Sequence, residues 1–166
     1  RLDLLANSWL VALPPDQSAG RVDWVSGASV MFRFSAVQEV GFFDPGYFLY
    51  FEEVDLMHRL SDRGWRTLYE PRAHVIHEEG AATGQFMRHQ KRQRRPAYLY
   101  HSWTYYFSRF YGRFGALCIA ATMIPAACLN ILHRRIRGLE PTLPLRFIRD
   151  HCRYVIRPLL LGTRDG

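Results

Sequence analysis

The chain has 166 residues, of which 48% are hydrophobic and 14% aromatic, and its formal net charge is +7. This composition excludes a disordered tail, which would carry fewer apolar and aromatic side chains. It also excludes a disulfide scaffold and a cysteine-built zinc site, because the three cysteines, Cys118, Cys128 and Cys152, form no Cys-x-x-Cys pair. The length is that of one ordinary domain, and so few cysteines suit a reducing compartment.

The net charge hides a sharp asymmetry between the two halves of the chain. Residues 1–83 carry seven arginines and twelve acidic residues, whereas residues 84–166 carry fifteen basic residues and three acidic ones. Two halves of a chain with opposite net charge usually have different functions. We therefore look for chemistry in the acidic half and for an anionic partner, phospholipid or nucleic acid, of the basic half.

Residues 1–21 are expected to be a connector, because their apolar positions are broken by Pro14-Pro15 and by Ser18-Ala19-Gly20. The chain starts at Arg1, without an initiator methionine or a signal-peptide pattern, and we expect it to be the C-terminal portion of a longer protein.

The pattern that follows indicates short elements separated by turns. A turn and a strand are expected within Val22–Phe34, where Val30–Phe32 forms a short apolar run of the kind that is buried. A short helix over Ala36–Val40 is then predicted, with Ser35 as its N-cap and Gly41 as its end.

A longer helix is predicted over Glu52–Arg63, since apolar residues recur there at helical spacing and Gly64 lies just past its end. Trp65–Tyr69 and Ala73–His77 read as two short strands. Residues 22–84 are therefore expected to form a mixed α/β module.

Residues 85–166 are expected to be a basic, mainly α-helical region. Pro96 can open an aromatic-rich helix that runs to Tyr111. Phe114–Leu132 follows as 19 residues without a charge, and Leu143–Leu161 is a last basic and apolar stretch that we expect Pro158 to interrupt.

The densest chemistry lies where an aromatic loop meets the predicted helix at Glu52, Glu53 and Asp55. Free backbone N–H groups at a helix start stabilise carboxylates, and the preceding aromatic side chains can raise one carboxylate's pKa toward the range of a general base. The alternative is that these residues only stabilise the first turn of a helix.

Two histidines form a second candidate. His74 and His77 would point to opposite faces of a strand, so they are not a two-ligand pair. His77 alone can supply one imidazole to a divalent metal that is held mainly by oxygen ligands, or it can be a hydrogen-bonded histidine at a strand end.

Five ordered motifs together carry a resemblance that no single one would. They are Val22–Ser29, Val40–Asp44, Tyr47–Leu56, Arg63–Arg66 and Val75–His77. Over roughly residues 22–112 the sequence resembles the inverting family 2 glycosyltransferases, and in particular the bacterial rhamnosyltransferase-like enzymes of cell-surface polysaccharide assembly.

This resemblance implies a GT-A fold, a dependence on Mg²⁺ or Mn²⁺, and specific roles for single residues. Glu53 matches the catalytic base, which is commonly an aspartate in the family, and Glu52 and Asp55 would orient the site or bind the acceptor. The remaining matches are Trp24, Ser26 and Gly27, which would line the donor and acceptor cleft, and His77, which would help to hold the metal.

The resemblance also implies a missing part. The family's nucleotide-binding half carries an Asp-x-Asp metal motif, and this sequence contains none. We therefore expect the chain to be the acceptor-side half of an enzyme that transfers a sugar, with inversion, from a nucleotide-sugar donor to a lipid-linked or polysaccharide acceptor. Alone it would be inactive; the alternative is a non-catalytic remnant or a basic binding module.

The basic region admits three readings. A helix in the membrane interface, with arginines at anionic head groups, is favoured over a buried helical hairpin and over a full span. An enzyme with a lipid-linked acceptor would then work at the cytoplasmic face of the inner membrane. Nucleic-acid binding is disfavoured, because the aromatic residues recur too densely for one exposed face and no RNA-binding signature is present.

Overall fold

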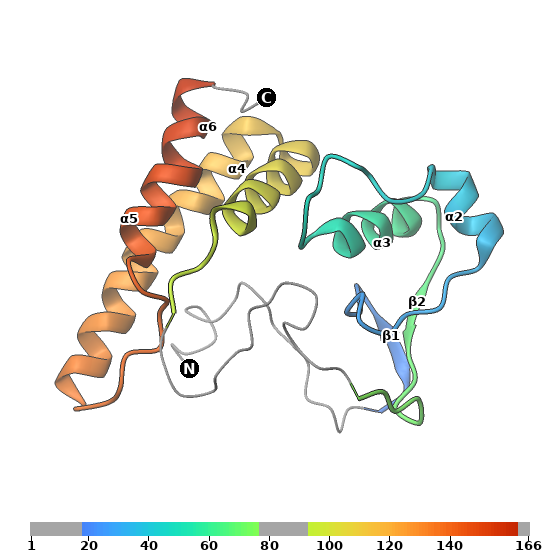
Figure 1. Cartoon of the computed structure of the whole chain (residues 1–166), viewed down its shortest axis with the longest axis horizontal. Coiled ribbons are helices and arrows are strands. Elements are labelled where there is room, and N and C mark those ends of the chain that lie inside the picture. The colour runs from blue at the N-terminus through green and yellow to red at the C-terminus, as the bar shows by residue number, and fades with distance from the viewer. Residues whose placement is uncertain (1–17, 77–92, 163–166) are drawn as a thin grey trace. The chain divides into compact units, whose positions relative to one another are not determined.

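A computed structural model describes residues 18–76 and 93–162 of the chain (Figure 1). They belong to two compact units, one within residues 13–91 and the other mainly within residues 92–166. Each unit is described by itself below.

The first unit contains a small antiparallel sheet of two strands. β1 (Gly20–Val22) pairs with β2 (Thr67–Tyr69), and the register places Arg21 opposite Leu68. The strand predicted around Trp65–Tyr69 is thus confirmed. Its partner, however, lies more than forty residues earlier in the chain, at the end of the expected connector.

Two helices supply the core of this unit. α2 (Phe34–Val40) ends at Gly41, whose φ of 85° gives the left-handed cap that glycine adopts at low cost. α3 (Glu52–Asp62) packs on it. The core residues are Ala36, Val37, Leu56 and Leu60, with Phe32, Val40 and Trp65 packed against them.

Three local expectations for this unit are wrong. Ser35 is not the N-cap of α2, because the helix already begins at Phe34 and Arg33 takes the cap position. Val30–Phe32 is not a strand, and Met31 is 97% exposed. Residues 73–76, the described part of the predicted second strand, are also not a strand. In the described part of the chain β1 and β2 pair only with each other. Residues 30–32 and residues 73–76 therefore have no neighbouring strand with which to pair.

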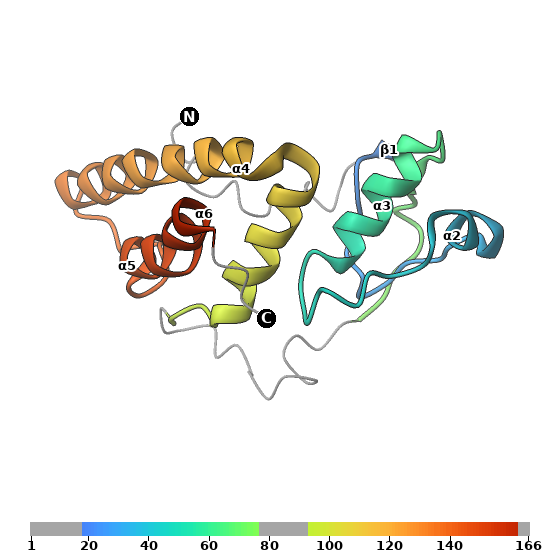
Figure 2. The same cartoon turned by 90° about the horizontal axis from the view of Figure 1, so that it is seen from above.

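The second unit is built on α4 (Ala97–Ile136), which contains a break. Gly112 has φ 68° and ψ 166°, outside the helical region, and α4 bends there (Figure 2). The two helical stretches predicted on either side of this glycine are confirmed. The first is lined by stacked aromatic side chains, for example Trp103 on Phe107 with ring centroids 4.3 Å apart.

A second long helical segment lies in the angle of α4 (Figure 2). It consists of α5 (Phe147–His151), the π-helical η1 (Cys152–Ile156) and α6 (Arg157–Leu161). The expectation that Pro158 interrupts this stretch is wrong. The wider π turns immediately before it remove the conflict between the proline ring and the carbonyl one turn earlier, so the segment continues.

Three polar contacts fasten this segment. Arg94 binds the buried Asp150 with two hydrogen bonds of 2.7 Å. The buried His151 donates from Nε2 to the carbonyl of Ala120 at 2.9 Å. At the other end, the Arg113 guanidinium binds the carbonyls of Leu159 and Leu160, where helix-end carbonyls lack partners within the helix.

Candidate functional site

The acidic residues lie at the start of α3, where the backbone takes an unusual path. Tyr50 and Phe51 have φ values of 68° and 71°, so two consecutive non-glycine residues adopt the left-handed conformation immediately before Glu52. Such a conformation costs on the order of 1–3 kcal/mol per residue and persists only where surrounding contacts enforce it. After this change of direction, Glu52 and Glu53 lie in the first turn of α3.

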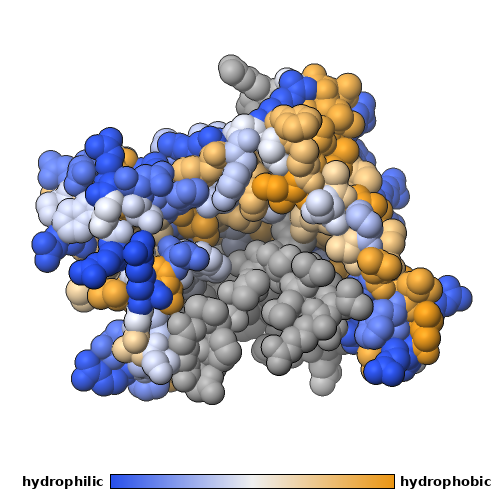
Figure 3. All heavy atoms as spheres, turned by 180° about the vertical axis from the view of Figure 1, so that it is seen from behind, coloured by the Kyte–Doolittle hydropathy of each residue, from blue (hydrophilic) through white to orange (hydrophobic). Residues whose placement is uncertain are grey.

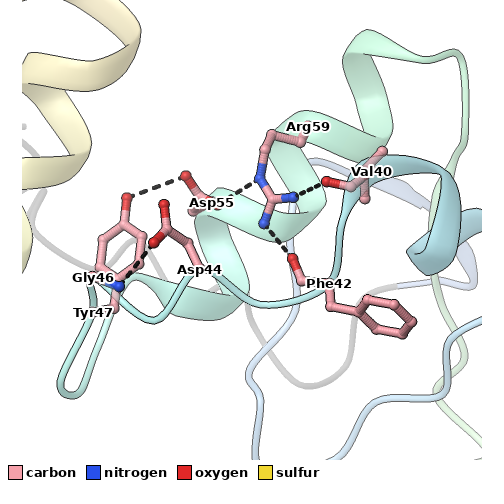
Figure 4. Close-up of polar contacts among 7 residues, drawn as sticks. All are labelled: Val40, Phe42, Asp44, Gly46, Tyr47, Asp55 and Arg59. Atoms are coloured by element: carbon pink, nitrogen blue, oxygen red, sulfur yellow. Dashed lines mark hydrogen bonds and ion pairs between the residues drawn. The ribbon is translucent and has the colours of Figure 1, made fainter.

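Asp55 makes some of the contacts that hold this turn in place (Figure 4). Its side chain is fully buried, and both carboxylate oxygens are used. The hydroxyl of Tyr47 donates to Oδ1 at 3.2 Å, and Nε of Arg59 donates to Oδ2 at 2.7 Å. Asp55 therefore ties the loop before α3 to the helix itself.

Arg59 extends the same network toward α2. Its Nη1 donates to the carbonyl of Val40 at 2.5 Å and its Nη2 donates to the carbonyl of Phe42 at 2.7 Å (Figure 4). The planar guanidinium thus joins three acceptors that come from two segments of the chain. Arg59 thus holds the start of the loop between α2 and α3, and Tyr47 ties the middle of this loop to Asp55.

Glu53 faces the segment that follows β1. Its Oε1 lies 3.4 Å from the backbone N of Gly27, which donates to it. Its Oε2 is buried and has no hydrogen-bond partner among the described residues. A Cβ built on Gly27 would lie 3.6–3.8 Å from the Glu53 side chain, which is ordinary contact. Glu53 thus has one oxygen oriented by the backbone and one left for another hydrogen-bond donor.

Glu52 has a related but different environment. Its Oε2 is also buried without a partner in the described ranges 18–76 and 93–162. Burial raises the pKa of this carboxyl above its ordinary value, a backbone hydrogen bond opposes the shift, and the charge of Glu53 adds to it. The direction of this shift agrees with the raised carboxylate pKa expected at this junction. Within the aromatic loop, Tyr47 is buried, whereas Phe48 is 80% exposed.

The other predicted site residues are placed as follows. Gly27 contacts Glu53, as described, and Ser26 makes a local turn by accepting at Oγ from the N–H of Ala28 at 3.3 Å. Trp24 is half-buried in the same segment. The structure therefore brings the 26–28 turn and Glu53 together. His77 lies outside the described residues.

A metal site cannot be completed from the described residues. In residues 18–76 and 93–162, no group of three or more His, Cys, Asp or Glu side chains is placed to hold an ion. Glu52 and Glu53 offer two carboxylates, but Asp55 is committed to Arg59 and Tyr47. The donor set that Mg²⁺ or Mn²⁺ needs is not met by these residues alone.

Sequence reasoning did not identify Arg59 and Tyr47. Asp55 and Arg59 stand four residues apart, and that spacing on a helix is a usable signal for an ion pair. The contact of Tyr47 depends on the path of an irregular loop, for which the sequence offers no comparable periodic signal.

The site thus consists of two carboxylates at the junction of a loop and a helix, which face a turn that follows a strand. Comparison with known proteins assigns the chain to a family. A family model described as glycosyl transferase family group 2 matches residues 5–158. The chain belongs to this family, and the resemblance seen in the sequence is confirmed.

Curated relatives narrow the comparison to rhamnosyltransferases. The chain is 40% identical over 82 residues to an N-acetylglucosaminyl-diphospho-decaprenol L-rhamnosyltransferase of Mycobacterium tuberculosis, a match that covers 48% of this chain and 27% of the relative. It is 48% identical over 56 residues to the rhamnosyltransferase WbbL of Escherichia coli, covering 34% of this chain and 21% of the relative. The chain thus spans about a quarter of the length of these relatives, and no solved structure matches it.

Proposed function

We propose that this chain is the acceptor-side part of a glycosyltransferase with a GT-A fold that moves a sugar, with inversion, from a nucleotide-sugar donor to a lipid-linked or polysaccharide acceptor in cell-surface polysaccharide synthesis. One observation carries the proposal for the chemistry. Glu53 has Oε1 oriented by the Gly27 N–H and a buried Oε2 that has no partner among the described residues. A carboxylate held in this way is ready to accept a proton from a substrate hydroxyl.

The three acidic residues are not equivalent in this respect. Asp55 accepts from Tyr47 and Arg59 with its two oxygens, so it acts here as a positioning residue that shapes the loop. Glu52 carries the raised pKa and adjoins Glu53, so it orients the site or contacts the acceptor. Only Glu53 combines a backbone contact to the 26–28 turn with an oxygen that no described residue binds, which favours Glu53 as the base.

The proposed step is a single displacement. Glu53 removes the proton of the acceptor hydroxyl as its oxygen attacks the anomeric carbon. The bond from that carbon to the diphosphate oxygen breaks, and the nucleoside diphosphate leaves with the electron pair. Because attack and departure occur on opposite faces, the anomeric configuration inverts. Trp24, Ser26 and Gly27 are proposed to line the cleft in which this happens.

A divalent cation is proposed as a partner of the whole enzyme and not of the described residues. Mg²⁺ or Mn²⁺ would neutralise charge on the leaving diphosphate when it is bound. His77 is the residue of this chain that we propose as a ligand, and it lies outside the described ranges. The described residues do not complete a site, so no step is assigned to the metal.

The relatives and the composition support the proposed acceptor and location. The relative from M. tuberculosis is named for a decaprenol-linked acceptor, which supports a lipid-linked acceptor here. The three cysteines are free and exposed, which suits a reducing compartment. We therefore propose the cytoplasmic face of the inner membrane as the location of the enzyme, with an anionic membrane surface as its partner.

The test uses the full-length protein with membranes, Mg²⁺ or Mn²⁺ and a panel of nucleotide sugars, and it measures release of nucleoside diphosphate. Glu53→Gln keeps the shape but removes the base, so we expect release to fall by about 10²–10⁴-fold. Glu70→Gln is the matched control, since Glu70 is exposed and paired with Arg72. Full activity of Glu53→Gln would refute the assignment, and no release by the wild type would favour a non-catalytic binding module.

A further inference from the structure

The second half of α4 exposes an apolar face along its whole length. Seven residues with successive spacings of four, three, four, four, three and four fall on one side of the helix, and all seven are exposed. We call them the outer stripe: Phe114, Cys118, Ala121, Pro125, Leu129, Leu132 and Ile136. The opposite side carries the buried residues Ala116, Ala120, Ala127 and Asn130.

The outer stripe is unusual for a helix in contact with water. Phe114, Leu132 and Ile136 are 80%, 54% and 75% exposed, and the stripe contains no charged residue. α4 is long and apolar enough to cross a membrane by length and composition, and only 22% of its most apolar stretch is buried. A core helix of a water-soluble domain would be mostly buried instead. Figure 3 shows apolar side chains gathered over this unit on one face.

The charges around the stripe favour an anionic partner. Residues 93–162 contain eleven arginines and two acidic residues, Glu140 and the buried Asp150. Exposed arginines stand before the uncharged stretch at Arg109 and after it at Arg135 and Arg137. An apolar face that is bordered by arginines matches a bilayer with anionic head groups.

The segment from Phe147 to Leu161 shows how α4 would meet such a bilayer. It runs antiparallel along the inner side of α4: Phe147 packs with Ala127, and His151 binds Ala120. It also carries exposed arginines at four-residue intervals, Arg149, Arg153 and Arg157. If α4 crossed the bilayer, these arginines would lie at the depth of the hydrocarbon, where a charged side chain is costly.

The geometry points to an in-plane membrane anchor: the second half of α4, residues 114–136, lies parallel to an anionic bilayer with the outer stripe in the acyl region, and the segment 147–161 stays on the water side. The stripe extends over 23 residues, about 34 Å at 1.5 Å per residue, so it provides a long, shallow contact. This inference rests on the proposed function, because it gives the proposed membrane association its face and orientation. It would hold a transferase beside a lipid-linked acceptor.

Vesicle co-sedimentation of the full chain tests the stripe independently of catalysis. We expect binding to vesicles of phosphatidylcholine and phosphatidylglycerol that weakens with added salt, and at least a tenfold lower partition coefficient for Leu129→Glu with Leu132→Glu. Leu160→Glu with Leu161→Glu is the matched control, because it adds the same charge at exposed leucines of α6. We expect this control and Glu53→Gln to bind within about twofold of the wild type.

Orientation is tested with single cysteines introduced at Arg109 and Arg137, the exposed positions that border the stripe, in a variant whose three exposed native cysteines are replaced by alanine. In the in-plane arrangement both react with a membrane-impermeant maleimide from the same side of sealed vesicles. Reaction from opposite sides would establish a span and overturn the proposal. Three other results would also overturn it. They are an equal loss of vesicle binding in both leucine pairs, no vesicle binding by the wild type, and a wild-type dimer that does not bind vesicles and that Leu129→Glu with Leu132→Glu dissociates. Loss of catalysis in Glu53→Gln with intact binding separates the two proposals.

Discussion

Arg59 donates from Nε to Oδ2 of Asp55 at 2.7 Å, one turn earlier on α3, and the pair is buried, with side-chain exposures of 15% and 0%. The same guanidinium holds the carbonyls of Val40 and Phe42. The contact therefore does more than join two charges on one helix. It fixes both the helix that carries Glu53 and the loop that leads into it.

Breaking this pair is expected to destabilise the first unit strongly. Asp55→Ala leaves the Arg59 charge in a largely buried place without its partner, and removal of one member of a buried pair costs about 3–5 kcal/mol. Arg59→Lys keeps the charge but loses the planar fork and so should fall between Asp55→Ala and the wild type. Denaturant unfolding measures both. Equal stability of Asp55→Ala and the wild type would show that the network does not hold the loop.

Glu52 is expected to make stability depend on pH in a defined direction. Burial raises its pKa in the folded chain above the ordinary 4.5, so ionisation opposes folding. Its effect on stability is absent below the unfolded-state pKa and becomes unfavourable as pH rises through the folded-state pKa. Glu52→Gln should therefore raise the denaturation midpoint at pH 7 and leave it unchanged below pH 4.5. A gain of the same size at both pH values would contradict this origin.

His151 is expected to have a pH effect of its own in the second unit. Burial lowers its pKa below the ordinary 6.5, although the hydrogen bond to the Ala120 carbonyl opposes the shift. The unfolded chain then takes up the proton first, so stability is full above pH 6.5 and declines as pH falls toward the folded-state pKa. Hydrogen exchange of residues 147–161 between pH 7.5 and 5 measures the decline. His151→Gln should abolish it, and His101→Gln, at an exposed position, should preserve it.

Two glycines with similar backbone angles provide a matched test of the Arg113 contact. Gly162 and Gly138 have φ values of 72° and 62°, so alanine at either position costs about 1–2 kcal/mol for the left-handed conformation. A Cβ at Gly162 would also lie 2.7 Å from Nη1 of Arg113, whereas nothing lies within 4 Å at Gly138. Gly162→Ala should therefore cost more unfolding free energy than Gly138→Ala. Equal costs would mean that the guanidinium moves aside freely.

The helices could be predicted because their signals are local. The helix that begins at Glu52 was predicted from its spacing, and Gly41 marked the end of α2. The pairing of Gly20–Val22 with Thr67–Tyr69 could not be predicted, since register across so many residues leaves no local trace. Pro158 misled for a related reason: its effect depends on the π turns before it.

The candidate site, like the fold, could be predicted only in part. Glu52, Glu53 and Asp55 could be selected from sequence, but their different roles could not, because all three are carboxylates within one helical turn. Only the placement of Tyr47, Arg59 and Gly27 separates the paired Asp55 from Glu53.

The central claim is that Glu53 is the base, and steady-state kinetics of the full-length enzyme test it most directly. The account predicts that Glu53→Gln lowers kcat by about 10²–10⁴-fold with little change in KM for donor and acceptor, since a general base acts in the transition state. Glu52→Gln should retain most of kcat. A Glu53→Gln enzyme with near wild-type kcat, combined with a collapse in Glu52→Gln, would contradict the account and move the base to Glu52.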